Sequence, residues 1–180
     1  MSSGTKIALA SQVRVFPDFP HPGIAFQDLA PLYAAPGLIT RLGAEVADSF
    51  SGEFDTVLAV EARGFVLGTA VAMAARCPLV LARKQGKLPG PLHSAEYSLE
   101  YGSAVLTVQH GAISPESTVL AVDDVLATGG TLAAAADLVN QAGGGLAGFA
   151  VLLELGALGG RDRLQPARVF SLLTSGEAPK

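Results

Sequence analysis

Short apolar runs and stretches with helical spacing alternate along most of the chain. Five short runs are almost entirely apolar: residues 56–60, 78–82, 118–122, 149–153 and 169–173. Such runs are typical of strands buried on both faces of a sheet. Three stretches show helical spacing: residues 36–50, 65–76 and 131–142. This alternation predicts βαβ units, and therefore an α/β fold with a central, mostly parallel sheet flanked by helices.

Two segments interrupt this rhythm. Residues 83–91 hold two glycines, two prolines and three cations, a composition that predicts an irregular loop. After this loop, residues 96–101 and 104–109 predict an antiparallel hairpin joined at Gly102 and Ser103. Residues 16–23 are rich in proline, which fixes backbone angles and removes amide donors, so this stretch is also predicted to be irregular.

Length and charge narrow the functional classes. The 180 residues fit one domain, residues 1–180, and only 16% of them are charged, with a net charge of −4. A nucleic-acid partner and an anionic membrane surface are therefore not expected. No apolar run is long enough for a membrane span or a secretory signal, which predicts a cytoplasmic protein. The single cysteine, Cys77, excludes a disulfide framework, and no cysteine or histidine spacing predicts a metal site.

The strongest chemical signal follows the apolar run 118–122. Two adjacent carboxylates, Asp123 and Asp124, are followed by small residues at 127–130 and by a helix that begins near Thr131. Glycine backbone amides, threonine hydroxyls and a helix N-terminus together favour a phosphate. Carboxylates repel a bare phosphate but accept hydrogen bonds from a sugar diol, so the pattern predicts a phosphorylated sugar. The alternative is a strand, an aspartate turn and an ordinary N-cap at Thr131.

This motif resembles the 5-phosphoribosyl-1-pyrophosphate (PRPP) signature of the type I phosphoribosyltransferases. Further segments are similar to those members of the family that act on adenine: FPDFP at 16–20, PGI at 22–24, RGF at 63–65, RK at 83–84, GKLPG at 86–90 and YSLEYG at 97–102. These segments and the signature cover the chain from about residue 14 to about residue 173. The resemblance implies a small N-terminal hood region, a flexible loop carried by the antiparallel hairpin, and a homodimer.

The resemblance also implies the reaction of adenine with PRPP to give AMP and pyrophosphate, with Mg²⁺ bound through PRPP or pyrophosphate rather than by protein ligands. In that reaction a ribosyl cation forms as pyrophosphate leaves, so catalysis depends on positioning and on stabilising the separating charges. Asp123 and Asp124 then hold the ribose hydroxyls, with Asp124 near the developing cation. The 5-phosphate loop implied by the family consists of Ala127, Thr128, Gly129, Gly130 and Thr131.

The family pattern places the remaining roles on four cations and a few residues around the base. Pyrophosphate is expected to meet Arg63, Arg83, Lys84 and Lys87. Arg63 follows the apolar run 56–60 and so lies at the same sheet edge as Asp123. Adenine is expected to bind the backbones of Ala25 and Gln27, to lie between Phe26 and Leu126, and to receive a hydrogen bond or a proton near N7 from Glu100. Plain core packing of Phe26 and simple solvation of Glu100 are the structural alternatives.

Some residues depart from the family pattern, and some patterns mislead. Gln27 stands where arginine is common, Glu61-Ala62 where Asp-Ser is common, and Gln85 where another cation is frequent.

The GxGxxG match at 143–148 follows a helix and precedes a strand, the reverse of a dinucleotide fingerprint. The three histidines, His21, His93 and His110, are predicted to lie in surface loops. Two alternatives stay open: a PRPP-binding regulator without catalysis, and a transferase for hypoxanthine, xanthine or orotate.

Overall fold

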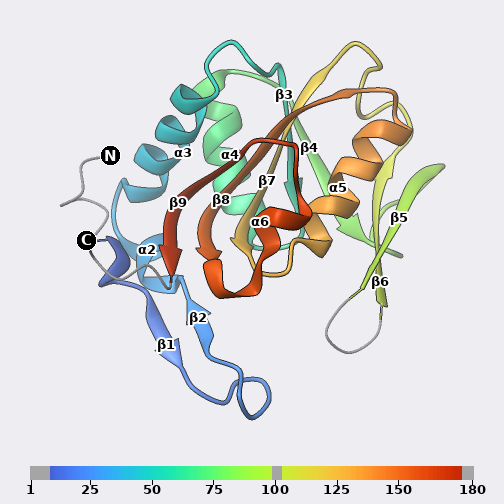
Figure 1. The fold of residues 1–180 in the computed structure, drawn as a ribbon. Coiled ribbons are helices and arrows are strands. Elements are labelled where there is room, and N and C mark those ends of the chain that lie inside the picture. Colours follow the sequence, from blue (N-terminus) through green and yellow to red (C-terminus); the bar gives the residue numbers. More distant parts are fainter. Residues whose placement is uncertain (1–8, 99–102, 176–180) are drawn as a thin grey trace.

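A seven-stranded sheet forms the centre of the structure, a computed structural model that describes residues 9–98 and 103–175 (Figure 1). From one edge to the other, the strands are β5 (Leu92–Ser98), β6 (Ser103–Gln109), β4 (Leu79–Lys84), β3 (Thr56–Val60), β7 (Thr118–Leu126), β8 (Gly145–Leu155) and β9 (Val169–Ser175). The strands from β4 to β9 in this order run parallel, whereas β6 is antiparallel to β4 and to β5. The predicted α/β fold with a mostly parallel sheet is confirmed.

Helices cover both faces of this sheet. On one face lie α3 (Leu38–Ser49) and α4 (Gly64–Ala75), and on the other lies α5 (Gly130–Gln141). The helix α3 forms because Leu38, Leu42 and Val46 recur at helical spacing and are all buried against the sheet layer. The shorter elements are α2 (Ala30–Ala34), the 3₁₀ turn η1 (Gly156–Leu158) and α6 (Gly160–Arg163).

A separate two-stranded sheet projects from the main body near the carboxyl ends of β7, β8 and β9 (Figure 1). It pairs β1 (Arg14–Phe16) antiparallel with β2 (Phe26–Asp28), and Arg14 Nε donates to Asp28 Oδ2 at 2.9 Å. This small sheet lies where the N-terminal hood region was expected. The predicted irregular stretch 16–23 is the connection between its two strands, apart from Phe16.

Two strands extend further than predicted, and both extensions matter for the site. Strand β7 continues through Asp123 and Asp124 to Leu126, so the carboxylates lie within the strand and not after it. Strand β4 continues to Lys84 because Arg83 and Lys84 pair with Thr107 and Leu106 of β6. The prediction of an irregular segment starting at Arg83 was wrong for these two residues, since a neighbouring strand supplies their hydrogen-bond partners.

The remaining patterns are placed as follows. The glycines of 143–148 form the turn after α5 and the start of β8, as expected for a segment that is no dinucleotide loop. His93 lies in β5 and its ring stacks on that of His110, with centroids 4.1 Å apart, so the prediction of scattered loop histidines was wrong for His93. Within residues 9–98 and 103–175, no helix combines the length and the apolar character needed to cross a bilayer.

Candidate active site

The two carboxylates of β7 are buried at the edge where the parallel strands end. Asp123 is 9% exposed and Asp124 5% exposed. Asp123 Oδ1 accepts a hydrogen bond from the backbone N–H of Asp124 at 2.8 Å. The neighbouring helix α4 can approach this point only because residue 64 is glycine: a Cβ there would lie 2.8 Å from Asp123 Oδ1. Two acids are therefore fixed side by side in a low-dielectric pocket.

Burial raises the pKa of both carboxyls. For Asp123 burial is the largest cause, and the charge of Asp124 raises the pKa further. For Asp124 burial is again the largest cause, but the guanidinium of Arg63 opposes it. Two adjacent buried acids are costly unless a cation or a ligand faces them, which makes the pair a candidate binding site.

Arg63 connects the carboxylates to the small sheet. It is the residue that precedes α4, and its Nε lies 2.6 Å from Asp124 Oδ2. Its guanidinium carbon also lies 5.5 Å from the centre of the Phe26 ring. Among the described residues, Asp124 Oδ2 has no partner with hydrogen-bond geometry, and the buried hydroxyl of Tyr33 also has none. Arg63 thus contacts both the acid and the aromatic ring.

Tyr33 is a site residue that the sequence did not reveal. Burial raises the pKa of its phenol to about 12, and the charge of Asp124 is the next largest cause. The residue lies in α2, a helix of five residues whose pattern shows nothing unusual. Only the fold brings this hydroxyl close enough for the charge of Asp124 to act on it.

The segment after β7 forms a backbone cradle. Residues 127–131 connect β7 to α5, and Gly129, at φ 79°, precedes the first helical residue, Gly130. Among the described residues, no side chain caps the first N–H groups of α5, so these donors have no protein partner of that kind there. The interpretation of Thr131 as an ordinary N-cap was wrong, because Gly129 occupies the cap position. A helix N-terminus that follows a glycine turn favours an anion.

The predicted cations divide into two groups. Arg83 donates from Nη2 to Glu61 Oε1 at 3.2 Å and from Nε to Oε2 at 3.3 Å, and the backbone N–H of Lys84 donates to the same carboxylate at 2.8 Å. The Arg83 guanidinium accordingly lowers the pKa of Glu61. Arg83 is therefore engaged by Glu61, whereas the side chains of Lys84, at the end of β4, and Lys87, in the loop that follows, are exposed.

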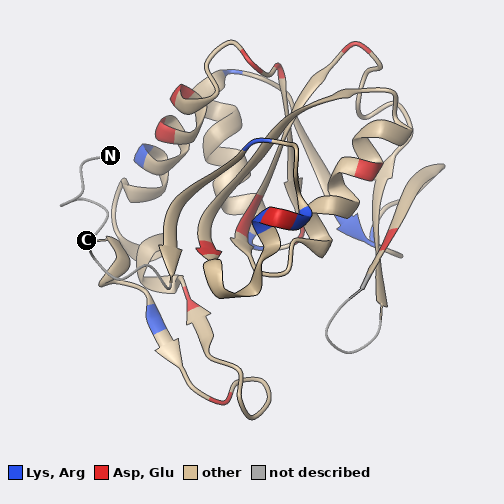
Figure 2. Ribbon diagram, in the orientation of Figure 1, with Lys and Arg blue, Asp and Glu red and all other residues tan. Residues whose placement is uncertain are grey.

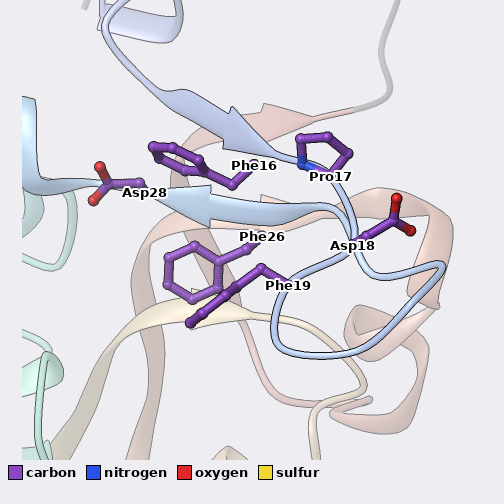
Figure 3. Close-up of a pocket in the computed structure, with 6 residues that line it drawn as sticks. All are labelled: Phe16, Pro17, Asp18, Phe19, Phe26 and Asp28. Carbon is purple, nitrogen blue, oxygen red and sulfur yellow. The ribbon is translucent and has the colours of Figure 1, made fainter.

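The small sheet carries a pocket of about 480 Å³ beside Arg63 (Figure 3). Its lining residues are Phe16, Pro17, Asp18, Phe19, Phe26 and Asp28. Phe19 and Phe26 meet edge to face, with ring centres 5.1 Å apart. Gln27 lies in β2, and its side-chain amide donates to the carbonyl of the exposed Ala25 at 3.3 Å. The aromatic surface and the backbone groups of residues 25 and 27 thus lie together.

Leu126 does not fit its expected place against the base. It is only 1% exposed and belongs to the core between the sheet and α5, so its side chain has no surface to offer a ligand. Its neighbour Val125 is half-buried and packs with the core on the α2 and α4 side of the sheet. The alternation of side chains along β7 turns one of these residues toward the site and the other away. Glu100 lies outside the described residues.

Asp123→Asn gives a first prediction. The folded protein binds the Asp123 proton more tightly than the unfolded chain does, so this carboxylate weakens the fold above its folded pKa. The neutral variant is expected to be more stable than the parent at pH 7, because it carries no buried charge at this position. Thermal unfolding measured between pH 7 and pH 4 checks this, and the gain should disappear toward the unfolded aspartate pKa of about 3.9. A variant less stable than the parent at pH 7 would contradict it.

Comparisons with known proteins agree with this geometry. Residues 30–178 match the family model of the phosphoribosyl transferase domain. The adenine phosphoribosyltransferase of Salinispora arenicola is 50% identical over 175 residues, which cover 96% of this chain and 93% of that protein. The crystal structure of adenine phosphoribosyltransferase from Rhodothermus marinus superimposes with a TM-score of 0.89 at 40% identity, covering 96% of this chain and 99% of the other.

A third relative was solved with ligands. The adenine phosphoribosyltransferase of Trypanosoma brucei, crystallised with AMP, pyrophosphate and ribose-5-phosphate, has a TM-score of 0.87 at 26% identity, over 96% of this chain and 80% of that one. The chain belongs to the phosphoribosyltransferase family and, within it, to the adenine phosphoribosyltransferases.

Proposed function

We propose that the chain transfers the 5-phosphoribosyl group of PRPP to N9 of adenine, releasing pyrophosphate and forming AMP in purine salvage. The observation that supports this most strongly is the buried Asp123–Asp124 pair directly before an uncapped helix N-terminus. That arrangement provides acceptors for a diol beside donors for a phosphate, the two ends of a phosphoribosyl group.

Asp124 stabilises the positive charge that develops on the ribose when the bond to pyrophosphate breaks. As the bond from C1 of the ribose to pyrophosphate breaks, positive charge develops on the ring and negative charge on the leaving group. A carboxylate held in a buried site stabilises the ring charge far more than one in water does. Asp123 and Asp124 accept the ribose hydroxyls, and the donors of residues 127–131 bind the 5-phosphate.

Arg63 changes partner when substrate binds. In the structure its guanidinium lies 2.6 Å from Asp124 and over the ring of Phe26. The pyrophosphate of PRPP carries more negative charge than one carboxylate and draws the cation away, which frees Asp124 for the sugar. Lys84 and Lys87 complete the pyrophosphate side, and Arg83 holds this segment to Glu61.

The base binds between the small sheet and β7. Phe26 provides one apolar face, and we assign the other to Val125 in place of the buried Leu126. The backbone groups of Ala25 and Gln27 distinguish a 6-amino from a 6-oxo purine, because donors and acceptors exchange between the two bases. The role of Glu100 near N7 stays a prediction.

Mg²⁺ is expected to enter as part of the substrate. Among the described residues, no three His, Cys, Asp or Glu side chains come together where they could hold a metal ion. An ion chelated by the pyrophosphate oxygens fits this donor set, because the substrate supplies most of the ligands. When bound, Mg²⁺ neutralises charge on the leaving group.

One experiment separates the candidate functions. Purified protein is incubated with PRPP, Mg²⁺ and one base at a time, namely adenine, hypoxanthine, xanthine or orotate, and nucleotide products are measured. AMP from adenine alone is the expected result. A nucleotide from another base would assign a different specificity. Tight PRPP binding without any product would favour the regulator, although a net charge of −4 offers little for nucleic acid.

Lys87→Ala tests the pyrophosphate side. Because Lys87 is exposed in the loop, its effect is expected to be electrostatic, raising KM for PRPP about threefold to tenfold at low salt. The difference should shrink as salt increases from about 0.05 to 0.5 M. Arg41→Ala, on the exposed surface of α3, is the matched control. It should change neither the KM for PRPP nor its dependence on salt. An unchanged KM for PRPP in the Lys87 variant removes this residue from the site.

A homodimer is the second element of the proposal. The helix α4 exposes Val66 and Met73, at 40% and 75%, and β4 exposes Leu79 and Leu81 on the same side of the sheet. Exposed apolar side chains grouped on one side of the sheet favour an interface, and a second copy would cover them. The cytoplasmic location stays a prediction.

Met73→Asp checks the assembly. The variant is expected to shift the mass measured by sedimentation equilibrium from dimer toward monomer, because a charge at the centre of an apolar interface is costly. Leu158→Asp is the control, since Leu158 is also an exposed apolar residue, at 45%, but lies in η1 away from this face. A monomeric parent protein, or a Met73 variant that stays dimeric, contradicts the assignment.

A further inference from the structure

A third buried carboxylate near the site has no part in the proposed reaction. Glu154, on β8, is 6% exposed and is held by Arg161 of α6: Nε donates to Oε1 at 2.9 Å and Nη2 donates to Oε2 at 2.5 Å. The hydroxyl of Ser171 on β9 also donates to Oε2. The Arg161 guanidinium lowers the pKa of Glu154, so the pair stays charged through the neutral range.

Arg161 is fixed to β9 as well as to β8. Its Nη1 donates to the carbonyl of Val169 at 2.9 Å, and its Nη2 donates to the hydroxyl of Ser171, also at 2.9 Å. Bidentate pairing to one strand and two bonds to the next leave the guanidinium little freedom. The charged residues of α6 and the end of β8 lie together beside the carboxyl end of β7 (Figure 2).

The residue before Arg161 packs directly on the 5-phosphate loop. A Cβ on Gly160 would lie 2.1 Å from the carbonyl oxygen of Ala127 and 2.8 Å from Cδ1 of Leu126. The contact is reciprocal, because a Cβ on Gly129 would lie 2.7 Å from the carbonyl oxygen of Gly160. The backbone of Gly160 therefore supports the loop at two of its residues.

The short helix cannot hold this place without help. A helix of four residues has almost no stability of its own, and α6 buries only Gly160. The loop also lacks a side-chain cap that would fix its amides from within. A binding site for phosphate needs those amides in one arrangement before the ligand arrives, since ordering them afterwards reduces affinity.

We propose that Glu154 and Arg161 are positioning residues for the 5-phosphate loop: their ion pair holds Gly160 against Ala127 and Gly129 and so fixes the backbone amides that bind the phosphate. This inference rests on the proposed role of residues 127–131. The same contacts exclude a second role for Arg161. A guanidinium bonded to Glu154, Ser171 and Val169 is a structural clamp and not a phosphate ligand.

The test compares Glu154→Gln, Arg161→Gln and the conservative Arg161→Lys. Both glutamine variants are expected to raise KM for PRPP about tenfold, while kcat and the KM for adenine at saturating PRPP change less than about threefold; Arg161→Lys should lie between them and the parent. Titration with ribose 5-phosphate should show the same loss of affinity, and titration with ribose, which lacks the phosphate, should show no difference.

Arg168→Gln provides the matched control for loss of stability. Arg168 makes an ion pair with Glu53 at 2.7 Å and donates to the carbonyl of Ser49 at 2.7 Å, on the far side of β9 from the loop. The melting temperature of this variant should fall, with KM for PRPP unchanged. An equal rise of KM in Arg168→Gln would show general loosening and overturn the inference.

The remaining outcomes are also decisive. If Arg161 bound phosphate directly, Glu154→Gln would leave PRPP affinity unchanged or improve it, which would overturn the clamp. Unchanged KM in all three variants would overturn it as well. If the parent protein makes no AMP, the proposed function fails separately, and the ribose 5-phosphate titration still decides whether the pair positions the loop.

Discussion

Asp124→Asn is expected to reduce kcat by a factor of about 10² to 10³, comparable to the loss of one preorganised electrostatic contact at a transition state. The side chain is 5% exposed at the end of β7, so its charge acts through a low dielectric on the ribosyl centre. Asparagine keeps the shape and still accepts a hydrogen bond from a hydroxyl. The KM for PRPP is therefore expected to rise less than kcat falls. Steady-state kinetics with both substrates varied measures the two effects.

The stability of the Asp124→Asn variant distinguishes a catalytic role of this residue from a structural one. Burial raises the pKa of Asp124, so the charge is unfavourable to the fold and its removal should leave the melting temperature unchanged or higher. The loss of the contact with Arg63 partly offsets this gain. A parallel fall of melting temperature and rate would show that Asp124 serves the fold and not the reaction.

Gly160→Ala is expected to lower kcat/KM for PRPP at least about 100-fold. The new methyl carbon would lie 2.1 Å from the carbonyl oxygen of Ala127, and both groups belong to backbone segments that cannot move independently. The 5-phosphate loop must therefore shift. Overpacking of this kind also costs about 1 to 3 kcal/mol of stability. Steady-state kinetics with PRPP varied and thermal unfolding measure the two losses.

Gly52→Ala is the comparison for this variant. Gly52 has φ 76° in a remote turn, and a Cβ there would meet nothing within 4 Å, so alanine strains the backbone without a clash. It should lose about 1 to 2 kcal/mol of stability and keep its affinity for PRPP. If Gly160→Ala lost no more PRPP affinity than Gly52→Ala, the packing of α6 on the loop would not contribute to PRPP binding.

The helices and strands could be predicted from the sequence because the spacing of apolar residues that indicates them is local. The run 56–60 became β3 with those same bounds, and the spacing of Leu38, Leu42 and Val46 placed α3 correctly. Strand ends were harder. The extension of β7 over Asp123 and Asp124 contradicts the rule that acidic residues end an apolar strand, because these acids face a ligand site and not the core.

The candidate site was predictable only where its residues adjoin in sequence. The carboxylates and the glycine turn form one continuous motif, but the placement of Leu126 depends on which face each residue of β7 takes, and a one-residue error reverses it. Tyr33 reaches the site through folding alone. The contact of Gly160 with Ala127 joins segments more than 30 residues apart, and a Gly-Gly-Arg sequence gives no local sign of it.

The position of Arg63 bears on the design of inhibitors. This one cation contacts both the aromatic face of Phe26 and the carboxylate of Asp124. A neutral purine mimic must displace this cation from the ring, and the displacement adds nothing to its affinity. A compound that joins a flat heterocycle to a stable diphosphonate would attract the guanidinium to a new position, so that the cation adds to its affinity.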